Sequence, residues 1–420
     1  TAIGRSALGA NTTGAQNTAI GTNALFANTT AAYNTAMGYG AGAAVTTGIY
    51  NTLAGSNAGT ALTVGRENAA FGYNSQATDT QGSHSVAVGP YALQNQNFTS
   101  ATDTYNTAMG YNAGGGITTG IQNTLIGGLA GDAITTASNN TAVGYESFSA
   151  NTTGTANTAL GAFAAKLNTT GNYNVALGYA SLEANTTGAN NTSIGFRSLD
   201  ANTTASNNTG VGYNALTANT TGTRNVGLGK SALVANTTGH SNTALGHDAV
   251  KTATTATYNT GLGRLALGAA TTGSFNTAVG ALSGDAITTG ADNTFVGYQS
   301  GSGTTTGADN TAIGQDALLA NTTGVNNVAL GSLALDANTT ANNNTALGMS
   351  ALTSNTTGSE NTAAGVSCLG SNTTAINNTA FGYNSLGANT TGAANTAVGR
   401  SALDANTTGT QNVAVGASAG

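Results

Sequence analysis

The sequence predicts an all-β protein: a repetitive parallel β-solenoid or β-roll with 17-residue turns. A glycine recurs with this period from Gly4 to Gly416, with one change of phase, and all 25 repeats carry it. The residues before each glycine alternate with the period of two that is typical of strands. Only 6% of residues are charged, while Gly, Ala, Asn and Thr dominate. A fixed period of this length indicates stacked units rather than globular domains.

Each repeat can be numbered from an anchor position 0, usually Asn, so that the unit reads N-T-A-I-G-x-x-A-L-x-A-N-T-T-G-x-x with its glycine at +4. The phase breaks once, between the anchors Ser85 and Asn106, where the step is longer than the regular period. We therefore predict one repeat domain, 1–420, with an irregular four-residue insertion within 89–105. The start at Thr1, in mid-repeat and without Met, is typical of a processed product or an excerpt.

Positions +1 to +3 carry the strand signal. Position +1 is mostly Thr or Val, +2 mostly Ala or Gly, and +3 nearly always a large aliphatic residue or Phe. Because side chains alternate along a strand, +1 and +3 share one face. We expect the +3 residues to form an aliphatic ladder inside the stack. Glycine at +4 then ends the strand where φ is positive or two backbones approach closely.

The side-chain sizes at positions +8 and +11 vary in opposite directions. Where +8 is Leu, +11 is usually Asn, and where +8 is Gly, +11 is aliphatic. Gly301 with Thr304 is a partial exception, and Leu267 with Ala270 breaks the pattern from the other side. The two side chains are expected to fill one cavity, with the chain folding back between them, since packed cores conserve volume. The pairs that obey the glycine rule are Gly42 with Val45, Gly59 with Leu62, Gly114 with Ile117, Gly131 with Ile134 and Gly284 with Ile287.

The apolar content of one repeat is small. Each 17-residue turn is ordered around about two large aliphatic side chains, so ladders of backbone, Asn and Thr hydrogen bonds must add stability. Several chains wound around a shared apolar axis would bury the aliphatic ladder better. We therefore expect a homotrimer.

Two segments resemble the head repeats of trimeric autotransporter adhesins, the YadA-like head: S-V-A-V-G at Ser85 to Gly89, and N-V-A-L-G-x-x-S at Asn174 to Ser181. Related repeats occur in bacteriophage tail fibres, and the resemblance covers essentially every turn. It implies a left-handed trimeric β-roll, an extracellular, cell-surface or virion location, and attachment to a host-surface or glycan receptor. Here the N-T-T-G extension makes the turn longer, and the family's heptad stalk and membrane anchor have no counterpart in these residues.

A second resemblance is to the left-handed β-helix acyltransferases. I-G-x-x-A-L at Ile3 to Leu8 is similar to their hexapeptide, but those enzymes repeat it continuously and hold a catalytic histidine in a cleft. This chain shows no nucleophile triad and no phosphate-binding loop. We predict that it is not an enzyme, has no catalytic, cofactor-binding or metal residues, and takes no cofactor.

Few single residues invite a chemical reading. The three histidines, His84, His240 and His247, occupy different repeat positions and are expected at the surface. The lone cysteine, Cys368, lies at +7, where every other repeat has Ala or Ser, and is expected to be a small buried filler.

The insertion is the one irregular feature, and it contains Pro90 and Phe98. It is either a bulged surface turn or a loop that contacts a receptor or a neighbouring rod. Asp79 and Asp103 flank it, so a local ion is a further alternative.

The sequon N-T-T occurs fourteen times, for example at Asn11, Asn151, Asn236 and Asn406. It is either a row of N-glycan acceptors or an asparagine ladder closed by side-chain hydrogen bonds to the backbone. Because Ile or Val replaces this Asn where +8 is Gly, part of the side chain must face inward. Neighbouring Thr residues at +12 and +13 point opposite ways, which counts against an ice-binding face built from them.

A net charge of −6 without a basic stripe argues against nucleic-acid binding, and no apolar run is long enough to insert into a membrane. The function predicted is an extracellular fibrous structural or adhesive protein, the rod or head of a surface attachment fibre, whose partner is itself. The alternative is a self-assembling extracellular filament or matrix protein. An ice-binding β-solenoid is a third, weaker possibility.

Overall fold

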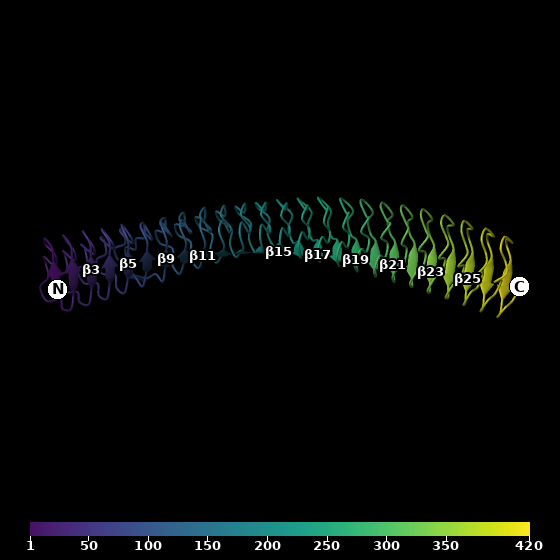
Figure 1. The fold of residues 1–420 in the computed structure, drawn as a ribbon, viewed down its shortest axis with the longest axis horizontal. Helices are drawn as coiled ribbons and strands as arrows, with labels where there is room; N and C mark the ends of the chain where they lie inside the picture. Colours follow the sequence, from purple (N-terminus) through teal and green to yellow (C-terminus); the bar gives the residue numbers. More distant parts are fainter. The chain divides into compact units, whose positions relative to one another are not determined.

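The computed structural model describes residues 1–420, which form strands, turns and bends without any helix. The chain divides into two compact units, Thr1–Asn208 (unit 1) and Thr209–Gly420 (unit 2). Each unit is a parallel β-solenoid with turns of roughly 17 residues, about 24 turns in the whole chain. Figure 1 shows the turns of each unit stacked one upon the next. The predicted fold is confirmed, while its left-handed sense and the single-domain reading stay predictions.

Nearly all strands are three residues long and lie at positions +1 to +3. The strands of unit 1 are β1 (Ala2–Ile3), β2 (Thr18–Ile20), β3 (Thr35–Met37), β4 (Thr52–Ala54), β5 (Ala69–Phe71), β6 (Gly82–Ser83), β7 (Val86–Val88), β8 (Thr102–Asp103), β9 (Thr107–Met109), β10 (Thr124–Ile126), β11 (Thr141–Val143), β12 (Thr158–Leu160), β13 (Val175–Leu177) and β14 (Thr192–Ile194). Those of unit 2 are β15 (Thr209–Val211), β16 (Val226–Leu228), β17 (Thr243–Leu245), β18 (Thr260–Leu262), β19 (Thr277–Val279), β20 (Thr294–Val296), β21 (Thr311–Ile313), β22 (Val328–Leu330), β23 (Thr345–Leu347), β24 (Thr362–Ala364), β25 (Thr379–Phe381), β26 (Thr396–Val398) and β27 (Val413–Val415).

The register between turns follows the sequence period. Within each unit, every strand at +1 to +3 pairs in parallel with the strand one turn away, so that Ala19 lies opposite Ala36. Across the insertion the pairing continues with a longer step, and Val86 lies opposite Thr107. Each repeat position therefore forms a continuous row along the stack of its unit.

The orientation predicted for the strand was wrong. Alanine at +2 points into the solenoid, with Ala19 and Ala36 fully buried, while the aliphatic +3 residues Ile20 and Met37 remain 38% and 43% exposed. The two-residue alternation was read correctly, but the wrong face was assigned to the interior. The +8 leucine, fully buried at Leu25, fills the space opposite the strand, so only a small +2 residue fits beside it.

The exchange between +8 and +11 is confirmed, and the structure adds a third partner at +2. A Cβ on Gly42 (+8) would lie 2.7 Å from Leu53 Cδ1 and 3.4 Å from Val45 Cγ2. Leu53 occupies +2 of the next turn, where it replaces the usual alanine. Gly59, the +8 glycine of Leu53's own turn, meets the same side chain at 2.8 Å. One large +2 residue therefore requires glycine at +8 in two successive turns.

The other large +2 residues obey the same rule. Leu125 lies against the glycines at +8 of its own turn and the preceding one, and Phe295 does likewise. The converse also holds, because a Cβ on Gly261 (+2) would lie 2.6 Å from the β-branched Val250 (+8) of the preceding turn. These glycines are Gly114 and Gly131 for Leu125, and Gly284 and Gly301 for Phe295. Volume is thus conserved among +2, +8 and +11.

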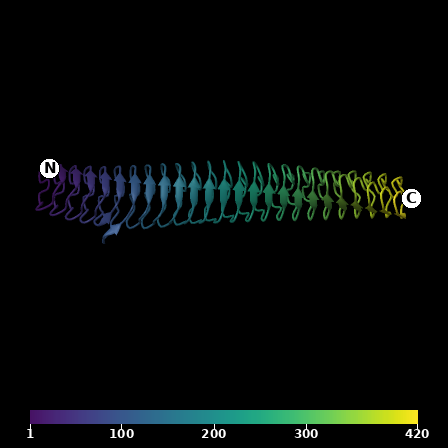
Figure 2. The same cartoon turned by 90° about the horizontal axis from the view of Figure 1, so that it is seen from below.

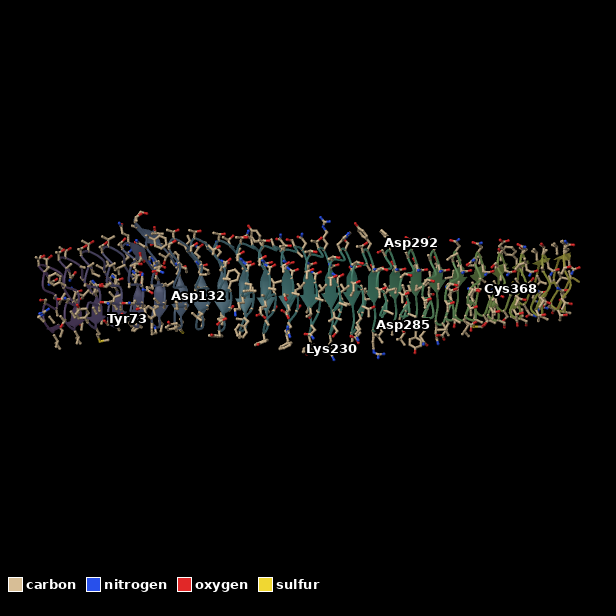
Figure 3. The ribbon with its side chains drawn as sticks, turned by 90° about the horizontal axis from the view of Figure 1, so that it is seen from above. Tyr73, Asp132, Lys230, Asp285, Asp292 and Cys368 are labelled. Atoms are coloured by element: carbon tan, nitrogen blue, oxygen red, sulfur yellow. The ribbon has the colours of Figure 1, made fainter.

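The small residue at +7 lies in the interior, as expected for Cys368, which is fully buried and labelled in Figure 3. Its thiol donates to the carbonyl of Ala380 at 3.2 Å, just as the Ser147 hydroxyl donates to Ala159. Burial raises the pKa of the Cys368 thiol to about 12, so the nucleophilic thiolate is absent at neutral pH.

The +4 glycines meet both of the alternatives foreseen for them. Their φ values lie between 126° and 143°, a region closed to L side chains. In addition, a Cβ on Gly38 would lie 2.5 Å from the carbonyl oxygen of Gly55, its equivalent in the next turn. Glycine is therefore required twice over, by the dihedral angle and by the contact between turns.

Side-chain truncation tests which strand face is internal. We expect Leu125→Ala to lower the free energy of unfolding by about 2–5 kcal/mol, since it empties a closed site. Its neighbour Ile126 is only partly buried, so Ile126→Ala serves as the matched control with a loss below about 1.5 kcal/mol. Denaturant unfolding followed by circular dichroism measures both. Equal losses would contradict the inward orientation of +2.

Two adjacent glycines test the close approach at +4. Gly127→Ala should destabilise the stack by at least about 2 kcal/mol, because the added methyl overlaps the Gly144 carbonyl at a φ of 134°. Gly128→Ala should be nearly neutral, since its nearest neighbour is a Tyr145 ring carbon at 3.6 Å. Thermal melts measure the difference in stability between the two variants. A neutral Gly127→Ala would contradict the close approach of backbones at +4.

Candidate functional site

Each unit carries an exposed apolar sheet face. It consists of the +1 and +3 side chains, and we call it the outer sheet face. Seven of its large +3 residues in unit 1 are between 36% and 57% exposed, and eight in unit 2 are between 38% and 71% exposed. These residues are Ile3, Ile20, Met37, Phe71, Met109, Leu160 and Ile194 in unit 1, and Leu245, Leu262, Ile313, Leu330, Leu347, Phe381, Val398 and Val415 in unit 2. The other large +3 residues, such as Ile126 and Leu228, are partly buried.

Two asparagine ladders lie on the inside of the turn. At the anchor position, Asn17 Oδ1 accepts from the backbone N of Asn34 at 2.9 Å, and Asn34 Nδ2 donates to the carbonyl of Gly48 at 2.8 Å. At +11, Asn168 Nδ2 donates to Asn151 Oδ1 at 3.1 Å in the preceding turn. These amides thus bond both to backbone groups and to the equivalent amide one turn away, which is how most buried polar groups are satisfied.

The ladder reading of the N-T-T sequons is supported at +11 in the interior turns. Asn151 and Asn236 are fully buried, which leaves no room for a sugar on Nδ2. Asn11 is exposed and Asn406 is half-buried. The threonines at the next two positions do diverge: Thr152 Oγ1 donates to the carbonyl of Thr169 at 3.2 Å, whereas the following threonine belongs to a single exposed row.

Secretion from a host that performs N-glycosylation tests the ladder. The N-T-T asparagines of the interior turns should carry no glycan, whereas Asn11, Asn406 and the exposed asparagines of the other Asn-x-Thr sequons can be modified. Those exposed asparagines are Asn97, Asn139, Asn190, Asn207, Asn343 and Asn377. Glycopeptide mapping by mass spectrometry should find every N-T-T peptide of the interior turns at its bare mass. A glycan on any of these interior asparagines would contradict the inward asparagine ladder.

The insertion builds a second small sheet in unit 1. Strand β6 pairs in parallel with β8, Gly82 opposite Thr102 and Ser83 opposite Asp103. Figure 2 shows this segment, in the blue of residues near 100, projecting from the regular turns. Residues 99–101 are exposed, whereas Phe98 is 6% exposed and turned inward.

Asp79 connects the residues at the base of the insertion through hydrogen bonds. It takes the +11 position and is fully buried. Its Oδ2 accepts from Gln76 Nε2 at 3.0 Å and from Gln96 Nε2 at 2.7 Å. Its Oδ1 accepts from the backbone N atoms of Gly82 and Phe98 at 3.0 and 3.3 Å. This local network replaces the asparagine ladders where the period breaks.

His84 lies at the surface of the insertion and links two turns to it. Its Nε2 lies 3.3 Å from Glu67 Oε2, and its Nδ1 lies 3.0 Å from Asp103 Oδ1. The ring stacks on Tyr105, with centroids 5.2 Å apart and an interplanar angle of 19°. The prediction of a plain surface histidine therefore missed its role. The signal was present in the period, because Glu67, His84 and Tyr105 each directly precede an anchor and so occupy the same repeat position.

A cavity of about 410 Å³ opens where the insertion overhangs the preceding turns. Its lining consists of Val64, Arg66, Ser83, Ala101, Thr102 and Asp103. Of the two aspartates that flank the insertion, only Asp103 reaches this cavity, since Asp79 is enclosed in the solenoid. The structure thus does not bring the pair together around one ion. No group of three or more His, Cys, Asp or Glu residues could hold a metal ion.

Other charged and aromatic side chains lie on the outside of the turns. In unit 1, Lys166 Nζ lies 2.6 Å from Glu146 Oε2 and 5.0 Å from the Phe163 ring centroid. This hydrogen bond lowers the pKa of the Glu146 carboxyl and raises that of the Lys166 ammonium. Figure 3 shows the same outward disposition in unit 2, with Asp292 at one edge and Lys230 and Asp285 at the other. Such partly exposed pairs contribute little to stability.

Comparison with known proteins adds no relative: no protein-family model and no curated protein matches the chain. The structure contains no helix with the length and apolar character needed to cross a membrane. The outer sheet face and the insertion cavity are the two features from which a function can be argued.

Proposed function

We propose that this chain is a fibrous structural and adhesive protein, the rod or head of an extracellular, cell-surface or virion attachment fibre, built by association of several copies through the outer sheet face. The observation that carries the proposal is the bare aliphatic row at +3. In unit 2, Leu330 and Leu347 are 46% and 38% exposed in consecutive turns, and six further large +3 residues of the unit are at least 38% exposed. Exposed apolar patches of several hundred Å² on soluble proteins mark interaction surfaces.

Self-association is the occupant favoured by the chemistry of this face. The +1 and +3 positions hold Thr, Val, large aliphatic residues and a few Ala or Phe residues, and no charged residue. Interface cores are similarly depleted of charge, and a face that repeats with every turn is complementary to a second copy of itself. Three copies placed around one axis would bury one face each with closed symmetry, and the resemblance to trimeric adhesin heads favours that number.

The composition of the interior is consistent with a structural role. It is filled by +2, +7 and +8 side chains and by asparagine ladders, and the outward rows vary from turn to turn. A constant interior that carries variable outer residues suits a fibre that attaches through its surface.

The ice-binding alternative gains one observation. Thr at +1 and an aliphatic residue at +3 are separated by one residue and face outward together, as in Thr18 and Ile20. An ice-binding face must remain in contact with water, whereas the proposed assembly covers it. The oligomeric state and a thermal-hysteresis measurement therefore separate these functions.

Charge placed on the outer sheet face tests the assembly. The variant Leu330→Glu/Leu347→Glu should raise the dissociation constant of the oligomer at least about 100-fold, because buried unpaired carboxylates are costly. Thr323→Glu/Thr340→Glu, in the exposed +13 row, is the matched control and should assemble normally. Sedimentation velocity and negative-stain imaging are the measurements.

Wild-type protein should sediment as discrete trimers of fixed length. A compact monomer at all concentrations would overturn the proposal, and long filaments that grow with concentration would favour the matrix-forming alternative. Assembly that survives the glutamate pair would place the contact elsewhere.

A further inference from the structure

We propose that the insertion cavity of unit 1 binds a neutral sugar residue of a surface glycan. The proposal names the ligand class for an attachment fibre and in that sense rests on the proposed function. The cavity lies where β6 and β8 lift the chain away from the regular turns, and it gathers Arg66 and Asp103 from a chain that has few charges.

The volume selects a small ligand. Cavities that bind small molecules measure about 300–1,000 Å³, so 410 Å³ suits a single ring or chain end rather than an extended polymer. Val64, which is 39% exposed, and Ala101 form an apolar wall against which the carbon face of a sugar ring can lie.

The polar lining offers donors and acceptors side by side. The Arg66 guanidinium takes part in no ion pair of the structure and presents only N–H donors. Asp103 Oδ1 faces His84, which leaves Oδ2 as an acceptor. The Thr102 hydroxyl donates to the carbonyl of Ser100 at 3.0 Å, so its oxygen is an acceptor. Ser83 Oγ accepts from the Arg66 backbone N at 3.2 Å, so its proton is available.

This mixture favours hydroxyl groups over ions. Each sugar hydroxyl is donor and acceptor at once, so a neighbouring pair can accept from Arg66 and donate to Asp103. An anion that approaches Arg66 meets the carboxylate of Asp103, and a cation that approaches this carboxylate meets Arg66. A neutral polyhydroxylated ring avoids both repulsions.

The cavity is held in shape before any ligand arrives. His84 Nδ1 lies 3.0 Å from Asp103 Oδ1, and the His84 ring stacks on Tyr105. The buried Asp79 network holds Gly82, which directly precedes Ser83, and Phe98, which lies three residues before Ala101. Preorganisation of this kind lowers the entropy cost of binding.

Saturation-transfer difference NMR tests the site in the full chain, with the methyl α-glycosides of glucose, galactose and mannose as probes. We expect saturable binding of at least one of them. Arg66→Ala and the nearly isosteric Asp103→Asn should each weaken it at least about tenfold, with unchanged circular dichroism and melting. Arg264→Ala, which removes an exposed arginine from unit 2, is the matched control and should bind as the wild type does.

Three results would overturn the proposal: no saturable binding of any neutral glycoside, undiminished binding by both cavity variants, or a preference for methyl glucuronide or inorganic phosphate over the neutral probes. Sedimentation of the same preparation keeps the two proposals apart. Trimers that bind no sugar would overturn only the sugar-binding proposal. A monomer that binds sugar would overturn only the proposed assembly.

Discussion

The contact between each residue and its own equivalent one turn away governs the structure of both units. Parallel pairing with a 17-residue register places like on like, as with Ala142 and Ala159. Neighbouring turns are then separated by one strand spacing, ~4.8 Å. At that distance, the +4 position tolerates only glycine, because its Cα faces the carbonyl of the next +4 glycine. The same spacing lets asparagine amides bridge from turn to turn at hydrogen-bond distance.

Because each row is built from one repeat position, compensation is local and runs between rows. A leucine at +2, as in Leu53, displaces bulk from +8 in its own turn and in the preceding one. The volume lost at Gly42 returns at Val45. The interior can thus vary in sequence while its volume remains constant. Each exchange couples adjacent turns, so the stability of the stack depends on pairs of neighbours rather than on single repeats.

Function is expected where this regularity is either left uncovered or interrupted. The outer sheet face repeats without charge and has no partner within the chain, and its association with other copies would give a fibre its thickness. At the insertion, the buried Asp79 replaces a ladder asparagine, and the chain lifts away to form a cavity with polar and apolar walls. The two proposals thereby place attachment and assembly on different surfaces.

The sequence by itself determined the solenoid, its register, the glycine corner, the buried +7 residue and the exchange between +8 and +11, since each depends only on periodicity and volume. It did not determine which face of the strand lies inside. Alternation distinguishes the two faces of a three-residue strand such as β2 but does not orient them, and a ladder of isoleucine and leucine was assigned to the interior on hydrophobicity alone. The tertiary structure reversed that assignment, because the +8 leucine already fills the space opposite the strand and admits only a small residue at +2. It also decided that His84, Glu67 and Asp103 meet, since the contact to Asp103 depends on the path of an insertion that no period describes.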